Sequence, residues 1–468
     1  MKRLTSYSLR FIPATLGLAL CLAAGSANAA STYFLPSGGV ANAGSYTWDQ
    51  STTVDWSTAS TGTPTETWAA ASLNSAFARF NAGSGKTYTV TANGDISIAG
   101  FWGYGTLTLN AAAGSGNDLN MQSGMQGILL SGAATVNAPI VGVGGIEPQY
   151  LASGAAISLY GNNTYSGGTY LYSSSVLVWI NNNNSFGSGN IQLGSGAMTS
   201  FNPVLATAPV TLANNFVHYA TDTADAINFG SSANSPVISS GTWSMGAVPV
   251  GIRNNGGSTS PLTLSGAISG SSTIVFSSNT GSSQIIAKGA NPFTGIIAVT
   301  GPGGTSAGAG STAVKLTLGA QNTFANASQV IMDGGVLDPG GFHHTMTSTT
   351  LSLTANSTID YTSGTAEMDF ADSSSVTWTA GKILNLVSTG GGNWNTSGDE
   401  LNFAQNPIGL DGARLGQIEF NGADLGDAAI DDNGFIYDSV QPIPEPSTLV
   451  LGLLGGLGLL WNARRRTA

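Results

Sequence analysis

The sequence predicts an all-β protein whose body is a right-handed parallel β-helix, also called a β-solenoid. The first observation is composition: the 468-residue chain holds 65 glycines and is 41% hydrophobic, yet only 8% of it is charged. The second is a recurring short apolar segment that alternates with polar residues, which is typical of strands with one buried face. The third is an internal repeat. No part of the body shows a sustained helical period.

The predicted strands follow one another with turn residues, mainly Gly, Asn and Ser, arriving roughly every 8–12 positions. Several of them alternate apolar and polar residues with a period of two. In chain order the clearest segments are 106–109, 127–130, 176–180, 190–193, 262–264, 273–276, 314–318 and 351–353. Together they indicate many short strands in a chain without a dividing linker.

Segments 161–198 and 289–337 share one pattern. Each has an Asn followed two residues later by an aromatic residue. A second aromatic residue comes after the next two predicted strands. A period of roughly 20 residues with three short strands is that of a parallel β-helix, in which stacked coils bury a continuous core. The Gly-rich insertion 301–310 lengthens the second copy, and we expect it to form a loop at one corner.

The first copy, at 161–196, resembles the autotransporter-associated β-strand repeat, which opens with Asn-Thr-Tyr-Ser-Gly-Gly-Thr and later has a Ser-Phe-Gly-Ser-Gly turn. The second copy resembles it more loosely, with Pro292 in place of Thr and Ala325 in place of Gly. The resemblance implies a solenoid body over residues 30–440. Its N-terminal cap is expected at about 30–110 and its closing segment at about 390–440.

Three tryptophans, Trp48, Trp56 and Trp68, lie in the expected N-terminal cap. We predict that they form a hydrophobic plug over the first coil. The alternative is a sugar-stacking platform, because exposed aromatic rings also serve carbohydrate binding.

The N-terminus predicts a secretory signal peptide at residues 1–29. Basic residues precede an apolar stretch at 14–24, and small residues stand at the expected cleavage position between Ala29 and Ala30. We therefore expect export through the Sec machinery. The single cysteine, Cys21, lies inside this peptide, so the mature chain is expected to hold no disulfide or thiolate metal site.

The C-terminal segment 442–468 has three parts: the triplet Pro444, Glu445 and Pro446, an apolar run at 448–461, and Arg464, Arg465 and Arg466. This order resembles the PEP-CTERM sorting signal, and the resemblance implies that a membrane-embedded exosortase-type enzyme cuts near the triplet. The apolar run is short against the roughly 17–25 residues of a comfortable span. We expect a single sorting helix that crosses the inner membrane transiently, with the arginines as its stop-transfer end. An ordinary membrane anchor is the alternative.

The body is strongly acidic. Six of the 13 basic residues lie in the two terminal segments, which leaves seven against 24 acidic residues, a net charge of −17 up to Pro446. A nucleic-acid partner requires a basic footprint, and an anionic membrane surface requires basic clusters. The sequence therefore excludes nucleic acid as a partner.

The histidines offer one conceivable metal site, formed by His343, His344 and Asp338. Neighbouring residues on a strand point to opposite faces, so the two imidazoles can share an ion only in a turn. We favour an exposed loop here and predict no metal site.

No motif selects a catalytic residue, and we predict none. The pairs Asp333/Asp338 and Glu367/Asp369 are the only places where we would seek the two carboxylates of a glycosidase. The few scattered basic residues argue against polysaccharide lyase chemistry. A Ser-His-Asp triad lacks its G-x-S-x-G elbow.

One acidic stretch before Gly434 is a candidate calcium loop; it contains Asp424, Asp427, Asp431 and Asp432. A calcium loop places oxygen ligands at alternate positions, and Ala429 stands where the first ligand belongs. We predict a turn between two closing strands, and no cofactor other than loosely bound surface calcium.

These features predict a non-enzymatic protein of the cell surface, outer envelope or extracellular matrix, structural or adhesive, with extracellular polysaccharide as a candidate partner. The alternative is a carbohydrate-active β-helix enzyme, either a polysaccharide lyase or a hydrolase. A self-secreting autotransporter passenger is disfavoured, since it needs a C-terminal translocator barrel of alternating strands.

Overall fold

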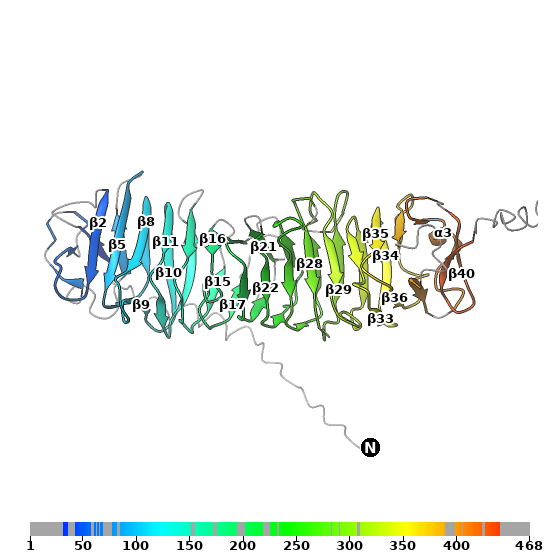
Figure 1. Cartoon of the computed structure of the whole chain (residues 1–468), viewed down its shortest axis with the longest axis horizontal. Helices are drawn as coiled ribbons and strands as arrows, with labels where there is room; N and C mark the ends of the chain where they lie inside the picture. The colour runs from blue at the N-terminus through cyan, green and yellow to red at the C-terminus, as the bar shows by residue number, and fades with distance from the viewer. Residues whose placement is uncertain are drawn as a thin grey trace, which may run out of the picture.

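The computed structural model describes residues 31–439, except 36–42, 58–59, 62, 65, 69–76, 82–84, 151–154, 172–175, 194–201, 219–224, 232–233, 282, 290, 307–308, 389–397, 405 and 424–425. The chain is all-β, with about 1% helix, and forms a parallel β-solenoid of about 11 turns, which confirms the predicted fold class at that level. It is an elongated rod with its strands across the long axis (Figure 1). The signal peptide with Ala29 and Ala30, and the sorting segment 442–468, lie outside the described residues.

Successive turns stack their strands into three long faces. On the first face, an 11-stranded sheet is parallel except where β1 meets β3. Its spatial order is β26 (Ile268–Ser269), β23 (Trp243–Ser244), β20 (Phe216–His218), β17 (Ile191–Leu193), β15 (Thr169–Leu171), β13 (Gly145–Tyr150), β10 (Met125–Leu130), β7 (Phe101–Tyr104), β4 (Phe77–Asn81), β1 (Ser31–Phe34) and β3 (Trp56–Ser57). Later turns contribute instead to a separate three-stranded parallel sheet. Its strands are β33 (His343–Met346), β36 (Glu367–Phe370) and β38 (Glu400–Phe403).

The second face is a 13-stranded parallel sheet that spans most of the rod. Its strands are β2 (Gly44–Asp49), β5 (Thr87–Asn93), β8 (Thr106–Ala111), β11 (Ala133–Val136), β14 (Ala156–Leu159), β16 (Leu177–Ile180), β18 (Asn202–Ala206), β21 (Asp225–Ser231), β24 (Val250–Asn254), β27 (Thr273–Ser277), β29 (Ile296–Thr300), β31 (Gln329–Asp333) and β34 (Thr350–Ala355).

The third face has a short and a long parallel sheet. The short one contains β6 (Asp95–Ile98), β9 (Asp118–Met121) and β12 (Ile140–Gly142). The long one contains nine strands: β19 (Val210–Leu212), β22 (Val237–Ser239), β25 (Leu262–Leu264), β28 (Gln284–Ala287), β30 (Lys315–Leu318), β32 (Val336–Asp338), β35 (Ser357–Asp360), β37 (Leu384–Val387) and β39 (Ile418–Phe420).

The core consists of every second side chain of these strands, stacked in columns. One column holds Val90, Leu109, Val136, Leu159 and Ile180, which are register partners across five neighbouring strands. All five are buried. Burying one such side chain contributes about 1.5–3 kcal/mol. Since a single turn exposes its inner face above and below, this energy is gained only when turns stack.

The corners of the repeat copies are held by buried asparagines. Asn163 accepts a hydrogen bond from the Ile140 N–H at 2.8 Å and donates to the Ser185 carbonyl at 2.7 Å, so it joins three turns. Asn291 accepts equivalently from the Ile268 N–H at 2.8 Å. The partners of Asn163 are 23 and 22 residues away, so turns here are slightly longer than the predicted 20.

Aromatic residues fill the N-terminal end of the rod. The rings of Trp48, Trp56 and Trp68 lie 4.4–5.2 Å apart between centroids, and each side chain is at most 1% exposed. Phe34 and Phe80 pack against them. These tryptophans therefore bury apolar surface at the end of the core and offer no exposed ring for a sugar.

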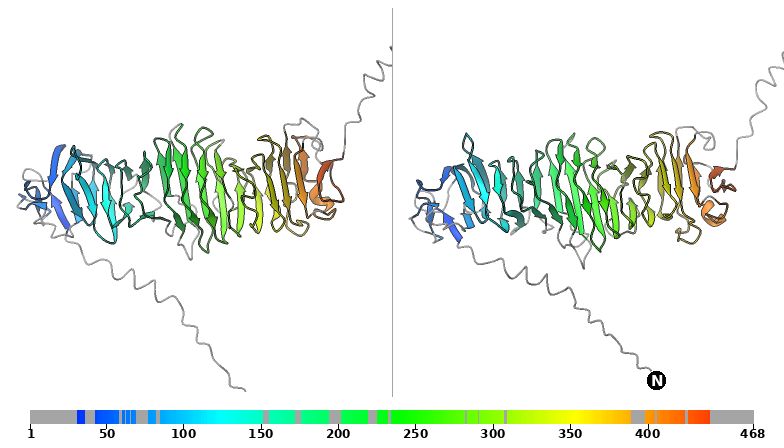
Figure 2. Two further views of the ribbon diagram at one scale, coloured as in Figure 1. Left: turned by 60° about the horizontal axis from the view of Figure 1, so that its bottom comes forward. Right: turned by 90° about the horizontal axis from the view of Figure 1, so that it is seen from below.

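A small hairpin and a short helix lie at the C-terminal end. Strands β40 (Ala428–Ile430) and β41 (Ile436–Asp438) pair antiparallel, and the Phe403 N–H of edge strand β38 donates to the Gly434 carbonyl at 2.9 Å. The four-residue helix α3 (Gly412–Leu415) was not predicted; Asp411 caps it by accepting from the Arg414 N–H. Both turned views show the strand stack running between the two capped ends (Figure 2).

Candidate functional site

A close group of titratable side chains lies on the outer surface of the β33–β36–β38 sheet. His343, Glu367 and Glu400 are register partners on the three strands, and Asp369 lies two residues beyond Glu367 on the same strand. Alternation along a strand places all four side chains on one face of the sheet. We call His343, Glu367, Asp369 and Glu400 the histidine–acid cluster.

Within this cluster the imidazole lies between two carboxylates. His343 Nε2 is 2.9 Å from Asp369 Oδ2, and His343 Nδ1 is 3.4 Å from Glu367 Oε2. The His343 side chain is 44% exposed, whereas that of Asp369 is only 6% exposed. The cluster thus has an accessible histidine above a buried acid.

These contacts shift the acid–base behaviour of the cluster. The hydrogen bond to Asp369, together with the charges of Glu367 and Glu400, raises the pKa of His343. Partial burial, followed by the neighbouring charge of Asp369, raises the pKa of Glu367. The carboxylates are therefore crowded enough to compete for a proton or for a cation.

Glu400 also borders a cavity between β38 and the closing hairpin. Its volume is ≈ 420 Å³, and its lining includes the acids Asp399, Glu400 and Asp431 and the aromatic residues Phe435 and Tyr437. The Asp399 carboxylate accepts from the Ser388 hydroxyl at 2.5 Å and from the Ala366 N–H at 3.2 Å. The lining of the cavity is therefore acidic, and one of its acids, Asp399, is held in place by hydrogen bonds.

The metal site considered from the sequence is not assembled. His343 and His344 lie on strand β33 and not in a loop, so our preference for an exposed loop is wrong. As expected on a strand, they face opposite sides: His344 is buried with Nε2 2.9 Å from the Pro339 carbonyl. Asp338 is held by other partners. The structure instead brings His343 to Glu367 and Asp369, which the sequence linked only as a carboxylate pair.

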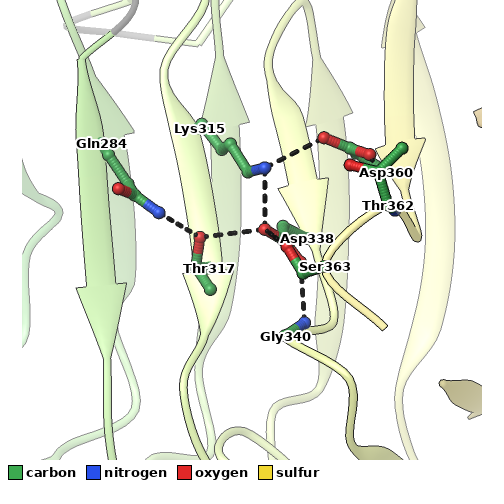
Figure 3. A network of polar contacts seen from close by, with 8 residues as sticks. All are labelled: Gln284, Lys315, Thr317, Asp338, Gly340, Asp360, Thr362 and Ser363. Atoms are coloured by element: carbon green, nitrogen blue, oxygen red, sulfur yellow. Dashed lines mark hydrogen bonds and ion pairs between the residues drawn. The ribbon is translucent and has the colours of Figure 1, made fainter. Parts of the chain in front are cut away.

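Asp338 lies in a polar network on the third face (Figure 3). Its carboxylate is 2.8 Å from Lys315 Nζ and accepts from the Ser363 hydroxyl at 2.6 Å and the Gly340 N–H at 2.7 Å. Lys315 also contacts Asp360 at 2.9 Å. Although burial lowers it, hydrogen bonding to both acids raises the pKa of Lys315. This is the arrangement of a structural ion pair.

Asp333, the other member of its candidate pair, secures the glycine-rich insertion. Its buried carboxylate accepts from the backbone N–H groups of Thr305 and Ser306 at 2.7–2.9 Å, and from the Thr354 hydroxyl at 2.6 Å. Asp333 and Asp338 therefore bind different partners. Neither carboxylate is presented to a substrate.

In the acidic stretch near the C-terminus, Asp431 shapes the predicted turn. Its Oδ1 accepts from the N–H groups of Asn433 and Phe435 at 2.8 and 2.9 Å, between β40 and β41. Asp424 lies outside the described residues. Asp431 Oδ1 therefore holds the hairpin turn.

A second candidate surface lies near the other end of the rod, on the outside of β1, β4 and β7. Tyr33, Arg79 and Trp102 are register partners on these strands, and Tyr104 follows Trp102 by two residues. The Arg79 guanidinium carbon lies 4.4 Å from the Trp102 ring centroid and 5.2 Å from that of Tyr33. We call these four residues the aromatic–arginine platform.

The platform is partly open to solvent, and its arginine forms no ion pair with a described residue. Tyr104 is 37% exposed, its ring lies 5.6 Å from that of Trp102, and the four side chains border a shallow hollow of ≈ 40 Å³. Among the described residues no carboxylate lies within ion-pair distance of Arg79; its Nη1 donates to the Tyr33 hydroxyl. The sequence analysis did not predict this platform. The alternation in Phe101–Tyr104 is the signal that could have found it, since Trp102 and Tyr104 occupy the outward phase.

The chain matches no protein-family model, no curated protein and no solved structure. Among the described residues, no helix has the length and apolar character needed to cross a membrane. The sorting triplet Pro444–Pro446 and the stop-transfer residues Arg464–Arg466 lie outside that part of the chain.

Proposed function

We propose that this protein is an exported, non-enzymatic rod of the cell surface or extracellular matrix, which adheres to polysaccharide through the aromatic–arginine platform. A β-solenoid fits a structural surface protein as well as a β-helix enzyme. The observation that carries the adhesive function is the half-buried stack of Tyr33, Arg79 and Trp102, bordered by the exposed ring of Tyr104. Flat aromatic faces pack against the C–H bonds of sugar rings, and a guanidinium binds a sugar carboxylate.

The acidity of the body does not oppose this contact at physiological salt. Charges more than about 8 Å away are largely screened there, and among the described residues Arg79 has no carboxylate within ion-pair distance. We therefore propose a preference for polysaccharides that carry uronic acids.

The binding test uses the native protein with polygalacturonate, and with neutral dextran as the second polymer. Wild type is expected to bind polygalacturonate more tightly. A Trp102→Ala/Tyr104→Ala variant should bind about 30-fold more weakly, since each aromatic contact contributes about 1 kcal/mol. Arg79→Gln should abolish the preference for the acidic polymer.

Trp179→Ala is the matched control, because Trp179 is a partly exposed tryptophan of β16, on another face. Unchanged affinity in the Trp102→Ala/Tyr104→Ala variant would refute the platform.

The same incubations report on the enzyme alternative, which the raised pKa of Glu367 favours. Polymer shortening that Glu367→Gln abolishes would establish an enzyme in place of an adhesive rod. Against it, Asp369 is too buried to reach a sugar.

The sorting part of the proposal concerns the two ends of the chain. We propose Sec-dependent export, cleavage between Ala29 and Ala30, a transient inner-membrane span, and processing by an exosortase-type enzyme near Pro444, Glu445 and Pro446. Intact mass and cell fractionation test this. Wild type should begin near Ala30, end near Pro446 and lie outside the inner membrane.

The Glu445→Ala/Pro446→Ala variant should keep its tail, including Arg466, and stay in the inner membrane. If wild type also retains Arg464, Arg465 and Arg466 and remains in that membrane, the tail is a plain anchor and the surface location is wrong.

A further inference from the structure

The histidine–acid cluster contains a buried carboxylate oxygen without a geometric hydrogen-bond partner in the described part of the chain. Asp369 Oδ2 contacts His343, but Asp369 Oδ1 is buried and accepts no hydrogen bond from any described residue. A buried polar atom without a partner costs about 1–3 kcal/mol, and more when it is charged. Native structures rarely retain such an atom unless a ligand, water or proton occupies the space before it.

The surrounding charges make a cation the fitting occupant. Glu367 and Glu400 add two further carboxylates around the single imidazole of His343. One imidazolium cannot balance three carboxylates, and among the described residues Lys315, Arg414 and the other basic side chains make no ion pair with this cluster. The negative charge of the cluster is therefore only partly compensated.

The geometry suits one small ion. One ligand atom from each of His343, Glu367 and Asp369 lies within 4.8 Å of the others. Ligands bound to tetrahedral zinc at about 2.0–2.2 Å lie about 3.3–3.6 Å from one another, so the three side chains must draw together by about 1 Å, with both carboxylates turned toward one ring nitrogen of His343. His343 is the outermost ligand, which leaves room for water on the open side.

We propose that His343, Glu367 and Asp369 bind one divalent transition-metal ion, of the class of Zn²⁺ or Mn²⁺. Imidazole nitrogen with two carboxylates is a ligand set for these ions. Calcium prefers six to eight oxygen ligands and is disfavoured by the imidazole. The ion would join two neighbouring strands of the solenoid, β33 and β36, and Glu400 on β38 adds a negative charge beside it.

The test is calorimetric titration of the chelator-treated native protein with ZnCl₂, MnCl₂ and CaCl₂ in turn. Zinc or manganese is expected to bind with one equivalent per chain and to raise the unfolding temperature, with calcium binding more weakly. Asp369→Asn and His343→Gln should each weaken zinc or manganese binding more than about tenfold. Asp372→Asn is the matched control, since Asp372 is an exposed acid of the same region that accepts from the Ser374 N–H.

Circular dichroism of each variant is the check that the solenoid is intact. An unchanged spectrum means that a loss of metal binding is not caused by a loss of fold. Absence of saturable binding of both zinc and manganese would overturn the site and leave a shared proton between Glu367 and Asp369. Equally, stoichiometric binding that persists in Asp369→Asn and His343→Gln would place the ion elsewhere. Polysaccharide binding by the platform, at the other end of the rod, is unaffected by either result.

Discussion

Replacing Lys315 with methionine is expected to lower the free energy of unfolding by about 3 kcal/mol, the lower end of the range for breaking a buried ion pair. Asp338 is only 1% exposed, and Lys315 Nζ at 2.8 Å is its cationic partner. Without that ammonium the Asp338 charge stays buried. Hydrogen bonds from Thr317, Gly340 and Ser363 still reach it, which limits the loss. Urea unfolding followed by circular dichroism measures the change.

A double variant separates the effect of the lost charge from the effect of changed packing on stability. Lys315→Met/Asp338→Asn removes both charges and should recover most of the stability, because the buried charge is then gone. Lys288→Met is the control, since Lys288 is exposed on the turn after β28. If Lys315→Met unfolds at the same urea concentration as Lys288→Met, the network in Figure 3 contributes nothing to stability.

A second large effect is expected at the N-terminal end of the rod. Trp48→Ala should cost about 3–5 kcal/mol, the usual range for truncating a buried aromatic residue. Trp48 is fully buried on the edge strand β2, with Trp56 and Trp68 around it. Loosening this cluster also uncovers the edge of the stack, which promotes edge-to-edge association. Urea unfolding and size-exclusion chromatography measure both consequences.

Two further variants make this prediction specific. Trp48→Phe should cost much less, because the Trp48 indole N–H has no hydrogen-bond partner among the described residues and the ring surface is largely kept. Trp179→Ala, on the outer surface of β16, should change stability little. Equal losses in Trp48→Ala and Trp179→Ala would mean that the aromatic cluster does not stabilise the end of the rod.

Much of the architecture was predictable because strand character is local. In β5 and β8 the inward and outward side chains alternate, and this pattern is visible in the residues themselves. The asparagine shared by the two repeat copies marked a corner, and Asn163 and Asn291 hold equivalent hydrogen bonds there. The short helix α3 was missed because four residues carry no periodic signal.

The candidate sites were predictable only in part. Glu367 and Asp369 were selected as a pair of neighbouring carboxylates, and the structure places them on one face of a strand, as residues two apart must be. Their contact with His343 was not predicted, because His343 and Asp369 are 26 residues apart and belong to neighbouring turns. The tryptophans chosen as an alternative sugar platform are buried, and Trp102 and Tyr104, which lie on the outer surface, were not considered.

The sequence alone determined the all-β class, the stacking of short turns and the acidity of the body, since each follows from composition or from residues a few positions apart. Only the tertiary structure decided which outward side chains meet. Hydrogen-bond partners on successive turns are separated by 22 residues at one corner and 28 at another. Loops change the length of a turn at little energetic cost, while the core keeps the strands in register. The neighbours of His343 and Arg79 are therefore set by how the turns stack.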